Sequence, residues 1–508
     1  MDFWQGCVRG VRLPLRESVR RFEAAATSLV NWERSAATED VGSYMIRLNA
    51  RTLAAASMLA LTVAGAFAGA AHADTLRDAI TAAYAQNPTL AKARAQQRGT
   101  DETYVQARSQ LGPALSAQGA VDYQREPAYL GGNATAAEGT LSLSQNIFDS
   151  GNLASTLNAA EDTVKSGQEA LRSTEATVLF NVISIYTQVR TDQEALQIAQ
   201  TNYDTLKRQL DQTQAQFQAG QLTRTDVAQS QASLSQAEAS LAQAQATLDS
   251  DRATYVQVVG QSPTALDPEP DLPGLPADFN AATTAAENNN PDLASALYAR
   301  ASAHQAVGEA RSTFGPHVAV SATSTNLAPI NNLNEQLNET QAQVTLSIPL
   351  YASGMNSSRL REALENENAA KAQVDIVRRQ VDASVAQAWS QMLAAKSATA
   401  SNEEQVKAAQ VAFDGTHTEQ QVGLRTNLDV LLAEQTLNSA KLQLITARRS
   451  QYMAAAQLLQ VTGILDARLL APDVEVYDPN KNFKKVKNKG WTPIEPVVHA
   501  LDGLAAPK

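Results

Sequence analysis

The sequence predicts a mixed α+β membrane protein: an internal tandem repeat of long coiled-coil α-helices and short β-strands, with several chains sharing one β-barrel. Three observations lead to this fold class. A short phrase recurs at a fixed distance along the chain, apolar residues recur every seven positions over long stretches, and apolar and polar residues alternate beside Gly-Pro pairs. Aromatic residues make up only 5% of the chain, which suits closely packed helices better than one thick globular core.

The first segment with a recognisable role is 45–73, which has the pattern of a secretory signal peptide. Two arginines precede an apolar run at 53–70, and small residues close the segment. We expect cleavage between Ala73 and Asp74. A membrane anchor is the alternative interpretation of the apolar run.

Residues 1–44 precede this signal, and we interpret them as an artefact of an upstream start site. The one cysteine, Cys7, lies within them, so the exported chain is expected to have neither a disulfide nor a lipid-attachment cysteine. The net charge of −11 argues against nucleic acid as a partner.

The remaining chain contains two copies of one unit. GQLTRTDV at 220–227 returns as GLRTNLDV at 423–430, displaced by 203 residues. Breaker residues match at the same offset without a gap: Asn87-Pro88 with Asn290-Pro291, Gly112-Pro113 with Gly315-Pro316, Gly151 with Gly354, and Gly260 with Gly463. This constant spacing predicts that both halves build the same supersecondary unit. We place the first repeat at 74–266, a Pro-rich linker at 267–277, the second repeat at 278–465 and a C-terminal tail at 466–508.

Each repeat is expected to carry two strands of about ten residues. In the first repeat ALSAQGAVDY begins at Ala114 and GTLSLSQNIF ends at Phe148; in the second HVAVSATST begins at His317 and QVTLSIPL ends at Leu350. All four segments alternate apolar with polar residues, and their length is that of a tilted membrane-spanning strand with one face toward lipid. Two short soluble hairpins are the alternative.

Long helices are expected to follow the strands. Apolar residues at heptad spacing run from Asn152 to Phe217 with one slip of four residues, which predicts a helix about 100 Å long. A return helix over 227–258 covers only about half that distance, so a further helix from near Asn280, interrupted at Asn290-Pro291, has to complete it. Both chain ends and the linker are therefore expected to gather midway, as a belt around a helical cylinder.

Four strands cannot close a barrel, because an open strand edge is not tolerated in lipid. We therefore expect several chains to share one barrel, with the repeated turn at the far tip of each helical hairpin. Glycine and proline mark the breaks between strands and helices, at Gly112, Pro113, Gly151, Gly315, Pro316 and Gly354.

This order of elements resembles the TolC-like outer membrane factors, the outer membrane efflux protein family. The paired phrases LSQNIFDSG and LSIPLYASG and the paired tips carry the resemblance, which extends from Asp74 to about Asp466. It implies a homotrimer whose twelve-stranded barrel lies in the outer membrane lipid of a Gram-negative bacterium and continues as an α-helical tunnel in the periplasm. It also implies a periplasmic adaptor and an inner membrane partner, either an ABC transporter or a proton-driven pump.

The same resemblance makes the tips a candidate periplasmic gate. Its residues in this sequence are Gly220, Thr225, Asp226, Gly423, Arg425, Thr426 and Asp429. The resemblance implies that Asp226 and Arg425 can bridge the two hairpins, and that Asp429 contributes to a threefold ring of tunnel-facing acids. Gln420 replaces a gate tyrosine and Leu432 replaces a second ring acid, which predicts a looser and less charged gate. Helix capping is the alternative role of both aspartates.

The sequence predicts no catalytic residue, metal site or cofactor. The five histidines are scattered and no catalytic or phosphate-binding motif is present, so energy for transport has to come from a partner. The lysine-rich tail VEVYDPNKNFKKVKNKGW resembles the tails of family members that serve type I secretion, which favours a protein secretion duct over a small-molecule efflux channel. Contact with anionic lipid headgroups and a disordered, solvated end are alternative roles for this tail. A non-transporting coiled-coil scaffold is the remaining alternative, but it leaves the alternating segments unexplained.

Overall fold

The structure is a computed structural model that describes residues 74–125, 134–329 and 337–505. The expected signal peptide at 45–73, including Ala73, and the segment before it lie outside the described residues. Asp74 is the first described residue, and it pairs with Leu266 in an isolated parallel bridge.

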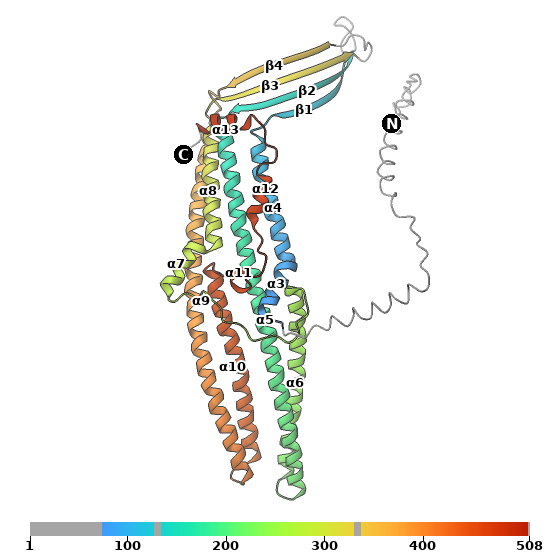
Figure 1. Ribbon diagram of the computed structural model, residues 1–508, viewed down its shortest axis with the longest axis vertical. Coiled ribbons are helices and arrows are strands. Elements are labelled where there is room, and N and C mark those ends of the chain that lie inside the picture. The colour runs from blue at the N-terminus through green and yellow to red at the C-terminus, as the bar shows by residue number, and fades with distance from the viewer. Residues whose placement is uncertain (1–73, 126–133, 330–336, 506–508) are drawn as a thin grey trace, which may run out of the picture. The chain divides into compact units, whose positions relative to one another are not determined.

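The two repeats contain the same six elements in the same order, which confirms the predicted tandem repeat (Figure 1). The first repeat comprises α3 (Leu76–Gln86), α4 (Pro88–Ser109), β1 (Ala114–Gln124), β2 (Ala134–Phe148), α5 (Asn152–Gln218) and α6 (Arg224–Val259). The second comprises α7 (Phe279–Asn289), α8 (Pro291–Ser312), β3 (His317–Pro329), β4 (Leu337–Ser347), α9 (Met355–Gln421) and α10 (Asn427–Val461).

The helices α5 and α9 each contain 67 residues and run from the sheet to the tips, with α8 and α10 between them (Figure 1). At 1.5 Å per residue each is about 100 Å long, as the heptad pattern predicts. The return helices α6 and α10 end part-way, and α4 and α8 complete the distance to the sheet (Figure 1). None of the described helices combines the length and the apolar character needed to cross a membrane.

The repeated Asn-Pro pairs join the short helices to the ends of the return helices. Asn87 caps α4 by accepting a hydrogen bond from Thr89 N–H (2.8 Å), and its side-chain amide donates to the carbonyl of Val258 in α6 (2.9 Å). Asn290 makes the matching bonds in the second repeat, to Asp292 N–H and to the carbonyl of Val461 (both 2.9 Å). These interruptions are therefore structural connections between stacked helices.

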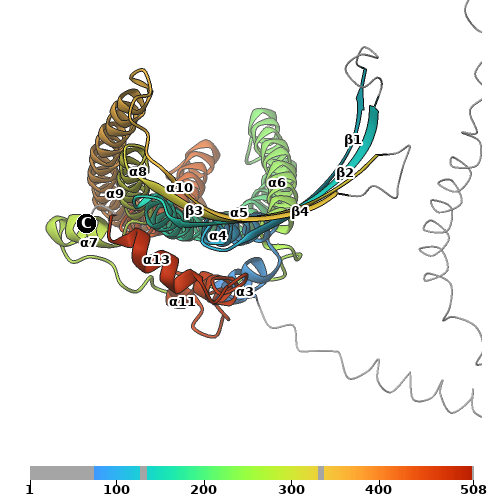
Figure 2. The same ribbon diagram turned by 90° about the horizontal axis from the view of Figure 1, so that it is seen from above.

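The four strands form one antiparallel sheet in the order β1-β2-β3-β4 (Figure 2). The strands contain 11 to 15 residues, slightly more than predicted. The expectation that the last strand continues to Leu350 is wrong, because β4 ends at Ser347. Pro349 has no N–H to donate to a neighbouring strand, and Leu350 is 92% exposed. Since β1 and β4 are the outer strands, their free edges need partners from outside the chain.

The largest apolar core lies midway along the helices, where α3, α5, α6 and the linker meet. Tyr186 and Tyr255 are fully buried there. The Tyr186 hydroxyl lies 2.9 Å from the carbonyl oxygen of Asp74 and 2.8 Å from that of Asp267. The start of the described chain and the linker are thus held to one side chain of α5, as expected for a belt at this level.

The C-terminal tail leaves this belt, contrary to the expectation that both chain ends stay midway. After α11 (Ala467–Leu470) the chain returns toward the sheet through α12 (Pro479–Val486) and α13 (Glu495–Gly503) (Figure 1). Phe483 packs edge-on against Tyr104, with ring centroids 5.2 Å apart, and Asn482 donates to Asp101 (2.6 Å). These contacts with α4 also exclude a disordered end for the described part of the tail.

The last helix of the tail caps the long helix α5. Asp502 is fully buried, and its carboxylate accepts hydrogen bonds from the N–H groups of Asp149 (2.6 Å), Gly151 (2.9 Å) and Ala154 (3.0 Å). Gly151 occupies the N-cap position with φ of 88° and has no side chain that could cap the helix. A carboxylate at this position also interacts favourably with the helix dipole.

We expect Asp502→Ala to destabilise the junction between strand and helix by about 1–3 kcal/mol, because three backbone donors in a buried site lose their acceptor. Thermal unfolding of the assembled protein and limited proteolysis of the tail would measure the loss. Glu475→Ala, which removes an exposed acid from the same tail, is the matched control. Equal cleavage of the two variants would contradict the capping role.

Candidate functional site at the hairpin tips

Both hairpin tips use a glycine to end the long helix. Gly220 has φ of 75° and Gly423 has φ of 80°, a left-handed conformation that other residues rarely adopt. In the first tip Gln221 N–H donates to the carbonyl of Gln216 (2.9 Å), and in the second Leu424 N–H donates to Glu419 (2.9 Å). The repeated glycine is therefore explained by helix termination.

Both aspartates of the repeated phrase belong to capping boxes at the start of the return helices. Asp226 accepts from the N–H (2.9 Å) and hydroxyl (2.7 Å) of Thr223, and Asp429 accepts from the N–H (3.0 Å) and hydroxyl (2.8 Å) of Thr426. These bonds lower the pKa of both carboxyl groups. Thr225 was among the predicted tip residues and Thr223 was not, although the T-x-x-D spacing identifies Thr223 as the cap.

Arg425 pairs within its own hairpin. Its Nε donates to Glu419 Oε2 at 2.8 Å, across the turn from the last residues of α9. No ion pair joins Arg425 to Asp226 within the part of the chain that the structure describes, so the implied bridge between hairpins is not made inside one chain. Both members of the observed pair are about half exposed, which leaves them accessible to a neighbouring subunit or partner.

The two hairpins are instead joined by a buried chain of amides and hydroxyls. Asn427, the first residue of α10, accepts from the Gln209 amide of α5 (2.6 Å) and donates to the Ser230 hydroxyl of α6 (2.9 Å). Ser230 in turn donates to the Thr213 hydroxyl (3.3 Å). All four side chains are buried. Since a buried polar group that loses its partner is costly, this network fixes the lateral position of one tip against the other.

Glu434 lies just above this network, in a groove of about 680 Å³ between the two hairpins. Leu206 of α5 and Leu431 of α10 line the groove with it. Glu434 is only 5% exposed. Burial raises the pKa of Glu434 to about 7, although Lys441 and Arg208 oppose this shift. Glu434 was not predicted as a site residue. The heptad spacing around it does not show that the other hairpin covers this face of α10.

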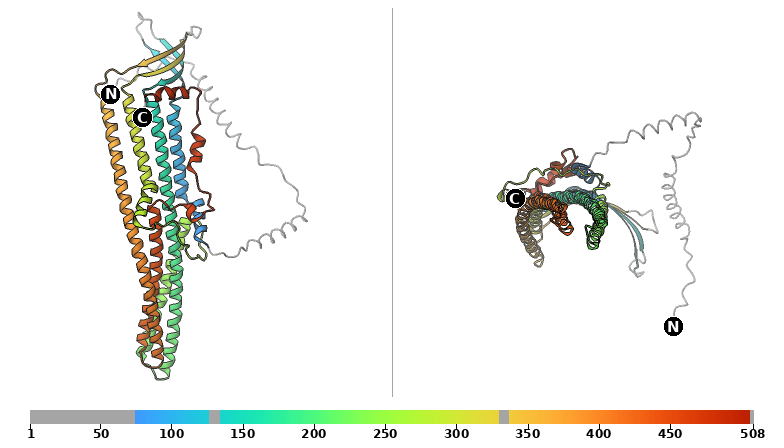
Figure 3. Two further views of the ribbon diagram at one scale, coloured as in Figure 1. Left: turned by 60° about the vertical axis from the view of Figure 1, so that its left-hand side comes forward. Right: turned by 90° about the horizontal axis from the view of Figure 1, so that it is seen from below.

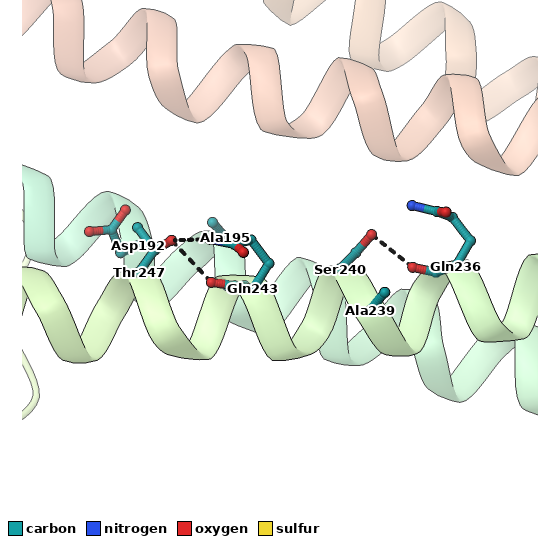
Figure 4. Close-up of a pocket in the computed structure, with 8 residues that line it drawn as sticks. Asp192, Ala195, Gln236, Ala239, Ser240, Gln243 and Thr247 are labelled. Atoms are coloured by element: carbon teal, nitrogen blue, oxygen red, sulfur yellow. Dashed lines mark hydrogen bonds between the residues drawn. The ribbon is translucent and has the colours of Figure 1, made fainter.

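A second groove, of about 420 Å³, follows α6 and includes Asp192 and Ala195 of α5 (Figure 4). Its floor contains the small residues Ala239 and Ser240. Burial, reinforced by the neighbouring Asp251 carboxylate, to which the protonated Asp192 can donate a hydrogen bond, raises the pKa of Asp192 to about 6. A surface with small residues at helical spacing can admit the side chains of a helix from a partner.

At the opposite end of the helices, the strand–helix breaks share a two-residue left-handed turn. Ser150 and Gly151 precede α5, and Ser353 and Gly354 precede α9; all four have positive φ. The glycines were identified from the sequence, whereas the serines were not. A left-handed serine is uncommon, so the recurrence at equivalent positions indicates that the corner needs this conformation in both repeats.

The two Gly-Pro breaks make different contacts. A side chain at Gly315 would collide with Ser150, whose hydroxyl donates to the carbonyl of Pro316 (2.6 Å), so the corner of the first repeat rests on the break of the second. The equivalent pair Gly112-Pro113 lies beside the tail, where Thr492 is the neighbour of Gly112.

A model of the family described as outer membrane efflux protein matches residues 79–261 and again residues 283–464. The chain belongs to the outer membrane efflux protein family. Each match lies inside one of the two proposed repeats, and together they include both tips and all four strands.

Individual relatives agree with this assignment. The outer membrane efflux protein BepC of Brucella suis is 32% identical over 421 residues, which cover 83% of this chain and 92% of BepC. The alkaline protease secretion protein AprF of Pseudomonas aeruginosa is 27% identical over 335 residues, which cover 64% of this chain and 69% of AprF. The solved structure of the outer membrane protein VceC of Vibrio cholerae has the same fold, with a TM-score of 0.66 and 20% identity over 76% of this chain and 96% of VceC.

As a member of this family the protein is an outer membrane channel of tripartite export systems and not an enzyme. It forms a homotrimer, in which three four-stranded sheets close one barrel above an α-helical periplasmic tunnel, and it works with a periplasmic adaptor and an inner membrane transporter. Within the described residues no three His, Cys, Asp or Glu side chains gather as a metal site.

Gln420 and Leu432, which the resemblance predicts to differ from the family gate, lie on either side of the second tip. Gln420 is half-buried in the last turn of α9, and Leu432 is 52% exposed on α10. The acid nearest to Leu432 along α10 is the buried Glu434. An ionisable group is therefore present at this level of the efflux protein. It lies between the two hairpins of one chain and not on the exposed face of α10 where Leu432 lies.

Glu434→Gln should remove a pH dependence from the contact between the two hairpins. A pKa raised from 4.5 to about 7 means that the packed state holds its proton more tightly, so stability falls as pH rises from 4.5 through 7. The full loss is on the order of 3 kcal/mol. The thermal unfolding midpoint of the trimer at pH 5 and pH 8 would test this, with a smaller difference expected for the glutamine variant.

Glu404→Gln is the matched control, because Glu404 is 75% exposed and pairs with Lys407, three positions along its own helix. That variant should keep the pH dependence of the unchanged protein. The same pH dependence in all three proteins would contradict a titrating group between the hairpins.

Proposed function

We propose that this chain is the exit duct of a type I protein secretion system, in which an inner membrane ABC transporter delivers its cargo through a periplasmic adaptor. The observation that carries the proposal is the lysine-rich tail, which resembles the tails of secretion members of the family: Lys481, Lys484, Lys485, Lys487 and Lys489. Similarity to the alkaline protease secretion protein AprF supports it.

Small-molecule efflux is the second candidate function. BepC, which is 32% identical to this chain, is described as an outer membrane efflux protein. A duct with a generic polar interior does not choose its cargo, because selection takes place at the inner membrane transporter. The sequence of the channel alone therefore favours secretion only through its tail.

Deletion of the gene in its native host separates the two functions. Under the proposal, one or a few large proteins should disappear from the culture medium while tolerance of dyes, detergents and antibiotics is unchanged. Sensitisation to these compounds with an unchanged set of secreted proteins would overturn the proposal in favour of efflux. Loss of both would mean that several transporters share the duct.

We also propose that the tips form the periplasmic gate of this duct. Support comes from three features: the tips lie at the end of the helices farthest from the sheet, Arg425 and Glu419 remain half exposed, and Asp429 stays ionised in its capping box. In a trimer these groups occur three times around one axis, where low-dielectric walls strengthen their fields. Gln420 and Leu432, in place of a tyrosine and an acid, favour a gate that opens readily.

Arg425→Ser is expected to raise the single-channel conductance of the trimer in planar bilayers, because it removes the exposed cation that pairs with Glu419 and is available to a neighbouring tip. The thermal unfolding midpoint should hardly change, since the pair is exposed. Arg224→Ser removes an exposed arginine from the other tip and is the matched control. An unchanged conductance in an intact trimer of the Arg425 variant would refute this role.

A further inference from the structure

The tail helix α13 has one buried side and one exposed apolar side. Val498 and Asp502 form the buried side, against α5 and the end of β2. The exposed apolar residues of α13 and its flanks retain between 38% and 84% of their accessible surface: Trp491, Ile494, Val497, Leu501 and Leu504. Since the last four are three or four positions apart, they form one stripe along the helix.

The contacts of α13 show which way this stripe is turned. Glu495 pairs with Arg108 at 2.5 Å, and Arg108 lies in the last turn of α4, on the helical side of the junction with β1. At 100° per residue, the buried line through Val498 and Asp502 lies between Glu495 and the stripe on the circumference of the helix. The stripe is therefore turned away from the helices, toward the level of the strands.

The position of α13 fits a membrane surface. The helix runs crosswise directly beneath the sheet, at a steep angle to the long helices (Figure 1), and it lies on the convex side of the sheet (Figures 2 and 3). When the sheets close into a barrel, the concave side encloses the channel and the convex side faces lipid. The exposed stripe therefore lies on the side of the molecule that faces lipid when the barrel is closed.

Lysine side chains supply the polar part of the same surface. Four lysines are exposed in α12 and in the turn that leads to α13, and the last three lie nearest to α13 along the chain: Lys481, Lys484, Lys485 and Lys489. Lys487 differs, because its ammonium group lies 3.6 Å from Glu161 and 5.2 Å from the ring centre of Tyr104. Three cations beside an apolar stripe with a tryptophan at its start match the charge and layering of an anionic phospholipid surface.

We propose that α13 is an interfacial anchor that lies in the periplasmic leaflet of the outer membrane. Its apolar stripe enters the acyl region, and Lys484, Lys485 and Lys489 bind anionic phospholipid headgroups. The proposal rests on the outer membrane location of the family and not on the choice between secretion and efflux. It also gives the tail two separable functions, since Asp502 acts on the buried side and the stripe on the other.

Tryptophan fluorescence tests this placement in the intact trimer, reconstituted in phosphatidylglycerol-containing vesicles. The described residues contain Trp389 and Trp491, and the other two tryptophans precede the expected cleavage site. In Trp389→Phe the emission reports on Trp491; in the matched control Trp491→Phe it reports on Trp389, which lies about 50 Å along α9 from the sheet. Phospholipids brominated on the acyl chains and aqueous acrylamide serve as the two quenchers.

We expect the emission of Trp491 to shift to the blue on reconstitution, to lose intensity with brominated lipid and to become shielded from acrylamide. The emission of Trp389 should not respond to brominated lipid. Substitution of Lys484, Lys485 and Lys489 by Gln should abolish any stronger quenching by brominated phosphatidylglycerol than by brominated phosphatidylcholine. If Trp491 stays open to acrylamide in vesicles, or is shielded from both quenchers because a neighbouring subunit covers it, the proposal is wrong.

Discussion

The unpaired backbone edges of β1 and β4 impose the constraint on which the rest of the molecule depends. In lipid each N–H and C=O group needs a protein partner, and a sheet of four strands satisfies only its interior. When neighbouring chains close the barrel, these edges become paired. Each chain then also contributes an equal sector of the helical tunnel that continues beneath the barrel. The two helical hairpins are that sector. Because α5 and α9 are of equal length, both tips end at the same distance from the sheet.

The tips meet two demands with few residues. Each turn has to end one long helix and start the next, and Gly220, Thr223 and Asp226 are used for this purpose, as are their counterparts in the second repeat. The aspartates are thus occupied by backbone and hydroxyl donors before any contact between hairpins is considered. The contact within one chain is made by neutral side chains, Gln209 with Asn427, which leaves the charged pair of Arg425 free to respond to another subunit or to the adaptor.

The elements could be predicted from the sequence because local patterns determine them. Heptads, alternation and a constant offset between repeats gave the long helices and the strands to within a few residues, and only Pro349 stopped a strand early. Tertiary contacts were less accessible. Nothing local distinguishes Asp502 as a helix cap more than three hundred positions from its helix, and nothing in the spacing around Glu434 shows that a second hairpin covers it. Thr223 is a different case, since its spacing from Asp226 carried a signal that was passed over.

The two repeats have the same backbone fold, but the C-terminal tail, which occurs once in the chain, makes their stabilising contacts differ. The first turn of α5 receives a carboxylate from Asp502, whereas α9 begins at Gly354 with no side-chain cap of its own. The corner of the first repeat also rests on Gly315, while the equivalent Gly112 rests on the tail. A helix that is fixed at its membrane end transmits a displacement of its tip differently from one that is not. The inequality between the hairpins therefore originates beside the membrane, at the end opposite the gate.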